Sequence, residues 1–238
     1  MPACGQERLT KLRQAATAPR RCPAGRARAA RPGLSLSTRM AVGLYGGSFN
    51  PVHAGHLHVA RTALRRLGLD RVIWLVSPQN PLKPSTGTAD LDARLVETRR
   101  LAQGPSMIIS DIERGIGTRY TLDTVRWLKA RFPGVRFVWI MGADSLAGFH
   151  RWRGWADLAR EVPIIVISRT GAATRSRFSP LARRFAGSRL APSAARTLAA
   201  RTPPAWIYLP APFHAVSSTE VRDSRLNKLT VRAIRRIV

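Results

Sequence analysis

Short, uninterrupted apolar runs recur along the chain, and each has the length of one buried β-strand. They cover residues 41–45, 71–77, 107–110, 135–141, 162–168 and 206–209. Strands that are apolar on both faces are typical of a parallel sheet that helices cover on both sides. The pattern therefore predicts a parallel sheet at the centre of the fold.

Helical spacing of apolar residues lies between these runs. It predicts helices over 55–67, 90–101 and 121–131, each following a strand. The alternation of strand and helix indicates an α/β fold, and no internal repeat interrupts it.

The chain begins with a stretch of different character. Residues 1–39 hold nine basic side chains and one acid, Glu7, without a sustained hydrophobic period. This composition buries too little apolar surface to offset its ordering entropy, so we expect a disordered extension ahead of one domain over 40–238. The Arg-rich start is also similar to an organellar presequence. An alternative is that translation begins at Met40, and we expect a chain that begins there to keep full activity and thermal stability.

A second unusual stretch covers residues 171–205, which are rich in Ala, Arg, Ser and Pro. It contains only a few apolar residues. We expect a surface excursion of the domain with one or two short helices.

Composition excludes several classes of protein. The 238 residues include 45% hydrophobic ones, an ordinary share for a globular protein, and the longest apolar runs are far too short to cross a bilayer. The two cysteines, Cys4 and Cys22, both precede the first predicted strand. A disulfide scaffold or a cysteine metal site is thereby excluded for the domain. We expect a cytoplasmic protein without a membrane partner.

The net charge is +27, and only four of the 40 basic residues are lysines. Such a charge attracts polyanions, so nucleic acids, acidic lipids and nucleotides all become candidate ligands. The arginines, however, are spread along the chain without one dominant block. We therefore expect no specific nucleic-acid partner, and the charge alone does not decide what the protein binds.

The most informative segment is GGSFNPVHAGH, residues 46–56. It ends the first predicted strand and opens the first helix, the position where nucleotides bind in open α/β sheets. Its glycines allow a phosphate to approach the backbone closely. His53 and His56 lie three positions apart and share one helix face, where both imidazoles can donate hydrogen bonds to phosphate oxygens. The segment is neither a P-loop nor a dinucleotide fingerprint.

A second anion-binding pattern lies near the end of the chain, in VSSTEVR, residues 216–222. Its hydroxyls and backbone N–H groups can cap a helix or bind an anion, and Arg222 adds a charged fork. A plain helix cap with an exposed arginine is the alternative reading if the segment is taken alone.

Together, the two segments resemble the (T/H)xGH and ISSTxIR signatures of the Rossmann-like nucleotidyltransferases. Asn50 stands where many members of that superfamily have Asp. The resemblance implies a doubly wound parallel sheet, with His53 and His56 at the transferred phosphate. It also implies that residues of both segments bind ATP, namely Gly46, Gly47, Ser48, Phe49, Ser217, Ser218, Thr219 and Arg222.

Three further segments narrow the resemblance to the nicotinate-nucleotide adenylyltransferases. They are SPQNPLK at 77–83, RYTLDT at 119–124, and GADSL followed by FHRWRGW within 142–155. The resemblance implies that Lys83 reaches the triphosphate and that Trp152 stacks on the pyridine ring, with Asp144 near the ribose. The implied mononucleotide-binding residues are Asn80, Tyr120, Thr121, Asp144 and Trp152.

The resemblance implies transfer of AMP from ATP to nicotinate mononucleotide, with pyrophosphate as the second product. No cluster of carboxylates or of Cys and His suggests a fixed metal site, so we expect Mg²⁺ to arrive with ATP and to be held by phosphates and water. The sequence leaves the oligomeric state open.

Two other readings stay open. One is a related nucleotidyltransferase acting on nicotinamide mononucleotide, on phosphopantetheine, or on glycerol phosphate with CTP. The other is a non-catalytic, basic RNA-binding protein on the same fold, which would have to retain both phosphate signatures without using them.

Overall fold

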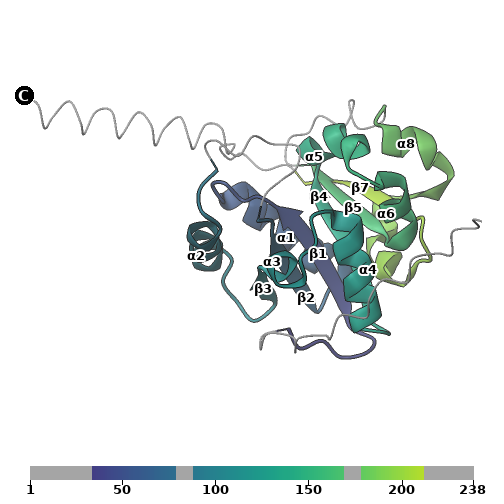
Figure 1. Cartoon of the computed structure of the whole chain (residues 1–238). Coiled ribbons are helices and arrows are strands. Elements are labelled where there is room, and N and C mark those ends of the chain that lie inside the picture. Colours follow the sequence, from purple (N-terminus) through teal and green to yellow (C-terminus); the bar gives the residue numbers. More distant parts are fainter. Residues whose placement is uncertain (1–33, 79–87, 169–177, 212–238) are drawn as a thin grey trace, which may run out of the picture. The chain divides into compact units, whose positions relative to one another are not determined.

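The computed structural model describes residues 34–78, 88–168 and 178–211. Within these ranges, seven strands form one sheet in the order β3-β2-β1-β4-β5-β7-β6 (Figure 1). All neighbouring strands are parallel. The strands are β1 Ala41–Gly47, β2 Arg71–Val76, β3 Met107–Ser110, β4 Arg136–Gly142, β5 Ile164–Ser168, β6 Arg189–Leu190 and β7 Trp206–Pro210.

The α-helices between the strands are α1 Ala54–Leu67, α2 Leu91–Leu101, α3 Ile112–Ile116, α4 Thr121–Arg131, α5 Ala143–Gly148, α6 Trp155–Glu161 and α8 Pro180–Arg184. The described ranges also hold three 3-10 helices, η1 Phe149–Arg151, η2 Ala186–Ser188 and η3 Pro192–Ala200. The chain runs outward from β1 to β3, returns to β4 beside β1, and then continues outward on the other side. The predicted doubly wound Rossmann-like fold is confirmed.

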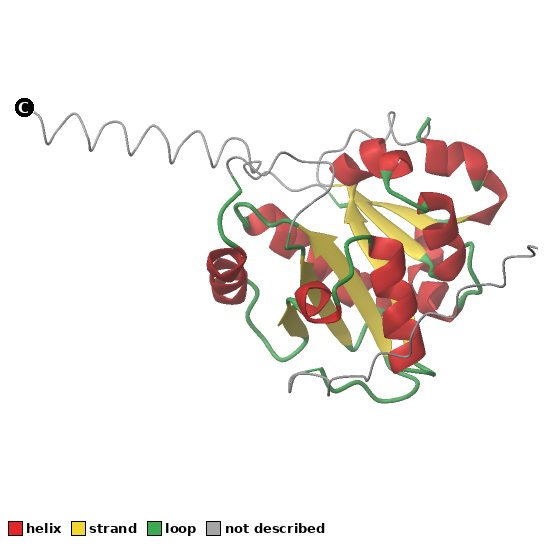
Figure 2. Cartoon of the chain, in the orientation of Figure 1, coloured by secondary structure: helices red, strands yellow, loops and turns green. Residues whose placement is uncertain are grey.

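Helices cover both faces of the sheet (Figure 2). Along β2, Val72, Trp74 and Val76 belong to one hydrophobic cluster, which includes residues of α1, α2 and η3. The alternate residues Ile73 and Leu75 belong to the other cluster, with residues of α4, α6 and α8. This alternation is the period of two that a strand imposes, and it explains why the strands appear in the sequence as continuous apolar runs.

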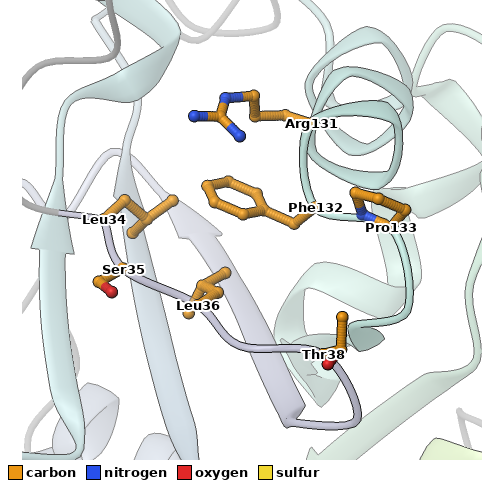
Figure 3. A pocket seen from close by; sticks show the side chains of 7 residues that line it. All are labelled: Leu34, Ser35, Leu36, Thr38, Arg131, Phe132 and Pro133. Carbon is orange, nitrogen blue, oxygen red and sulfur yellow. The ribbon is translucent and has the colours of Figure 1, made fainter.

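Residues 34–39, which the sequence analysis placed in the extension, pack against the sheet domain. Leu34 and Leu36 lie partly buried against the second hydrophobic cluster. The Arg39 N–H donates to the Gly134 carbonyl at 2.8 Å, and Arg136 Nη2 donates to the Arg39 carbonyl at 2.9 Å. Figure 3 shows the hollow between this segment and the C-terminal end of α4. The packed part of the chain therefore begins before Met40.

Residues 178–205 differ from the expected surface excursion, because they contribute to the core. Leu181 of α8 is 1% exposed, Leu198 of η3 is fully buried, and β6 extends the sheet beside β7. The physical reason is local: Ser179 caps α8, with its hydroxyl accepting from the Ala182 N–H at 3.2 Å, and the short helix then presents its apolar residues to the sheet.

Candidate active site

The candidate site lies at the carboxyl ends of β1 and β4. These strands pair in the middle of the sheet, with Tyr45 opposite Ile140, and the connections from them run in opposite directions. Open α/β sheets bind their ligands at such a switch point. The segment of residues 46–56 leaves β1 here, and Asp144 follows β4 directly in the first turn of α5.

The glycines at the end of β1 make room for aromatic rings. A Cβ atom on Gly46 would lie 2.5 Å from Cη2 of Trp139, and one on Gly47 would lie 3.1 Å from Cζ of Phe49. Sequence reasoning assigned these glycines to close approach of a phosphate. The structure supplies a packing requirement for Gly46, because a Cβ there would displace the Trp139 ring, and a tight contact for Gly47.

His53 and His56 form a reciprocal cap at the start of α1. His53 is the N-cap residue, and its Nδ1 accepts from the Gly55 N–H at 3.1 Å. In return, Nδ1 of His56 accepts from the His53 N–H at 3.2 Å. An Nδ1 atom that accepts carries no proton, so the proton of each neutral ring is on Nε2. The cap therefore sets both imidazoles to be donors through Nε2.

The two imidazoles are close together and held by an aromatic cluster. Their ring centroids lie 3.9 Å apart, and the His53 side chain is buried. The rings of His56 and Phe49 pack in a T-shaped arrangement, with their centroids 5.2 Å apart. The Phe49 ring also contacts the rings of Tyr45 and Trp74. Phe49 has a left-handed φ of 44°, an uncommon conformation for an aromatic residue. The Phe49 side chain, which was predicted to contact ATP, packs against the ring of His56.

Sequence reasoning missed Arg94, a residue on the buried face of α2. Its guanidinium donates to four backbone carbonyls, those of Ser48, Ser77, Pro78 and Ala89, at 2.7 to 2.9 Å. Burial lowers the pKa of Arg94, and the nearby charge of Asp90 opposes that shift. One signal was present: a charged residue stands on a helix face whose other buried members are Leu91, Leu95 and Thr98.

A buried carboxylate, that of Glu113 in α3, lies between the end of β2 and the start of α4. Its Oε1 accepts from the Thr124 hydroxyl at 3.2 Å, and the Ser77 side chain also hydrogen-bonds to it. Burial raises the pKa of Glu113, and the two hydrogen bonds partly offset that effect. Through these two hydrogen bonds Glu113 links Ser77, which follows β2, to α4, the helix that begins at Thr121.

The residues predicted to bind a mononucleotide come from two elements that meet. Tyr120 is the N-cap residue of α4, and the guanidinium of Arg153 lies 4.5 Å from the centre of its ring. Trp152 packs edge-to-face on Trp139 and Phe149, at 6.0 and 5.4 Å. Gly154 then takes a left-handed φ of 66°, close to Leu122. The structure thus brings Arg153 and Gly154, the two residues that follow Trp152, to the start of α4.

Several predicted site residues fall outside the described ranges, and their roles stay predictions. They are Asn80, Lys83, Ser217, Ser218, Thr219 and Arg222. Within the described ranges, no group of three His, Cys, Asp or Glu residues could hold a metal ion. No helix in that part of the chain is long and apolar enough to span a membrane.

Comparison with known proteins gives a consistent result. The model of the cytidylyltransferase-like family matches residues 44–224. Over 183 residues, 77% of this chain and 97% of the relative, the sequence is 61% identical to a probable nicotinate-nucleotide adenylyltransferase of a Caulobacter species. A relative of the same name from Cereibacter sphaeroides is 55% identical over the same shares of both chains. One from Methylorubrum extorquens, 99% of which is covered, is 53% identical.

The fold is also similar to that of Plasmodium falciparum nicotinic acid mononucleotide adenylyltransferase. The TM-score is 0.57 for that protein complexed with NaAD and 0.56 for its complex with APC. The match covers 77% of this chain and 83% of that chain, with 16% and 15% identity. At this level of identity the likeness shows the fold alone.

Proposed function

This chain belongs to the cytidylyltransferase-like family and, within it, to the nicotinate-nucleotide adenylyltransferases, and we propose that it transfers AMP from ATP to nicotinate mononucleotide. The products are nicotinate adenine dinucleotide and pyrophosphate. The observation that carries the proposal is the reciprocal histidine cap at the carboxyl end of β1. It leaves the Nε2–H groups of His53 and His56 as two hydrogen-bond donors at the start of one helix.

The transfer needs positioning and charge stabilisation rather than a covalent enzyme intermediate. A phosphate oxygen of the mononucleotide attacks the α-phosphorus of ATP, a new P–O bond forms, and the bond to the β-phosphate oxygen breaks as pyrophosphate leaves. Negative charge on the α-phosphoryl oxygens is stabilised by the Nε2–H groups of His53 and His56. Because both rings are held through Nδ1 and by packing on Phe49, little reorganisation is needed when the charge develops.

ATP enters as its Mg²⁺ complex, and the ion reduces the repulsion between the two polyanionic substrates. We expect the ion to be bound mainly by phosphates and water. We expect Lys83, Ser218 and Arg222 to bind the triphosphate, as the resemblance implies.

The mononucleotide lies along the start of α4 and the loop after β4. Trp152, whose ring is fixed by T-shaped contacts with Trp139 and Phe149, stacks on the pyridine ring. The N-terminal N–H groups of α4, at Thr121, favour a carboxylate over a neutral amide on that ring. We expect the protein to act in the cytoplasm.

The direct test is product analysis with purified protein, Mg²⁺ and ATP. Four acceptors are compared: nicotinate mononucleotide, nicotinamide mononucleotide, phosphopantetheine, and glycerol phosphate with CTP added. Pyrophosphate release with a new dinucleotide of the expected mass is predicted for nicotinate mononucleotide. RNA retention without pyrophosphate release from any acceptor would instead support a non-catalytic binding protein.

A further inference from the structure

Arg94 lies at the meeting point of three backbone segments beside the candidate site. Nη1 donates to the carbonyl of Ser48, in the turn between β1 and α1, at 2.8 Å, and to that of Ser77, after β2, at 2.7 Å. Nη2 donates to the Pro78 carbonyl at 2.9 Å, and Nε donates to the Ala89 carbonyl at 2.8 Å. With 2% of its surface exposed, the residue is part of the interior.

Burial of a cation costs desolvation free energy, and an apolar side chain of similar volume would pack a core at least as well. Within the described residues Arg94 forms no ion pair, so the four carbonyls are its direct partners and the nearby charge of Asp90 adds to them. Only the planar guanidinium offers donors in a fixed fork that can reach such separate acceptors together.

The segment held by Arg94 is the one that carries the histidines. Ser48 precedes the left-handed Phe49, whose ring contacts His56. Asn50, one residue further, accepts from the Ala89 N–H at 3.3 Å through its Oδ1. The turn is therefore joined to Ala89 twice, once directly through Asn50 and once through the guanidinium. A shift of this turn would move both imidazoles.

We propose that Arg94 is a positioning residue for phosphoryl transfer: its guanidinium sets the turn after β1 against the exit of β2, and thereby the position of His53 and His56 relative to the triphosphate of ATP. This inference rests on the proposed adenylyl transfer and adds to it. The mononucleotide side depends on Tyr120 and Trp152, which Arg94 does not contact, so the effect of Arg94 concerns the transfer step and ATP.

The test compares Arg94→Lys, which keeps the charge but not the fork, with Arg94→Ala, which leaves space for a free guanidinium ion. Arg99→Met is the matched control, because Arg99 lies on the exposed side of the same helix. Steady-state kinetics with ATP and nicotinate mononucleotide are measured with the melting temperature of each variant.

We expect Arg94→Lys to remain folded with kcat lowered on the order of 10- to 100-fold, since a misplacement of about 1 Å at a reacting centre has effects of that size. KM for the mononucleotide should change less than about threefold, and Arg99→Met should match the wild type. Guanidinium at millimolar concentration should restore part of the kcat of Arg94→Ala.

Wild-type kcat in Arg94→Lys with only a lower melting temperature would show a purely structural role and overturn the inference. Loss of kcat in both variants with an equal rise of KM for the mononucleotide and no rescue by guanidinium would overturn it too. If the wild type and Arg99→Met both fail to form the dinucleotide, the proposed function itself is wrong, and this inference with it.

Discussion

Replacing His53 by asparagine should keep the helix cap of α1, and hence the stability of the protein, while abolishing most of the catalytic rate. Replacing it by alanine should lower both the stability and the catalytic rate. The reason is that one side chain has two separable roles. Its Nδ1 caps the helix by accepting from the Gly55 N–H, and its Nε2–H is assigned to the transferred phosphate. Asparagine is among the strongest N-cap residues, but it has no group in place of Nε2.

The magnitudes follow from these contacts. Loss of an N-cap to alanine costs about 1 kcal/mol, which lowers the melting temperature of a domain of this size by about 2–4 °C. Loss of one preorganised donor to a developing oxyanion lowers kcat by about 10²- to 10³-fold. His53→Asn should therefore melt within about 1 °C of the wild type and share the low kcat of His53→Ala, with smaller changes in KM.

The assay is pyrophosphate release at saturating substrates, combined with thermal unfolding followed by circular dichroism. Ser179→Ala is a matched control, since it removes the N-cap of α8 far along the chain from the histidines. It should lose stability and keep kcat. A near-normal kcat in His53→Asn would refute the catalytic role, and equal melting temperatures for wild type and His53→Ala would refute the capping role.

Three further predictions test other parts of the structure. Gly46→Ala should lower the free energy of unfolding by about 1–3 kcal/mol through overpacking against Trp139, while Gly115→Ala, where an added Cβ meets nothing within 4 Å, should be neutral or stabilising. Glu113 has a raised pKa in the folded state, so its contribution to stability is greatest below the unfolded value of 4.5 and declines as pH rises through the folded pKa. Glu113→Gln should therefore gain stability relative to the wild type as pH rises above 4.5 in urea titrations, and a constant difference would count against burial as the cause. A chain that begins at Met40 should melt a few degrees below one that begins at Leu34, because the contacts of residues 34–39 are lost; equal melting temperatures would show that these contacts contribute nothing.

Much of the fold could be predicted because long apolar runs and full helical turns dominate it. The bounds predicted for β3 and α4 agree with the structure to the residue, and those for α1 and β2 differ by one. Helices of five to seven residues, such as α3 and α6, were missed because fewer than two turns show no period. Leu34 and Leu36 gave no signal for the same reason, although both pack on the core.

The site was predictable only where motif and local geometry coincide. The histidine pair was found because the motif that holds it is local, and the structure places its reciprocal cap within the same four residues. Arg94 was not found, because its acceptors lie up to 46 positions away and its place among the apolar positions of α2 was the only sign of burial. Gly46 was predicted to allow a phosphate close to the backbone, but the structure requires it for packing against Trp139. The sequence could not show this, because only the folded sheet places the strand of Trp139 beside Gly46.

The most direct test of the central claim is the paired measurement of kcat/KM for nicotinate and nicotinamide mononucleotides under identical conditions. A pocket that offers only N–H donors leaves the amide's own N–H₂ without an acceptor, which costs about 1–3 kcal/mol, and the carboxylate gains a charge-assisted bond in addition. We predict a ratio of at least about 10²-fold in favour of the nicotinate substrate, and Trp152→Ala should weaken both substrates while largely preserving that ratio. Equal kcat/KM values for the two substrates in the wild type would contradict the account.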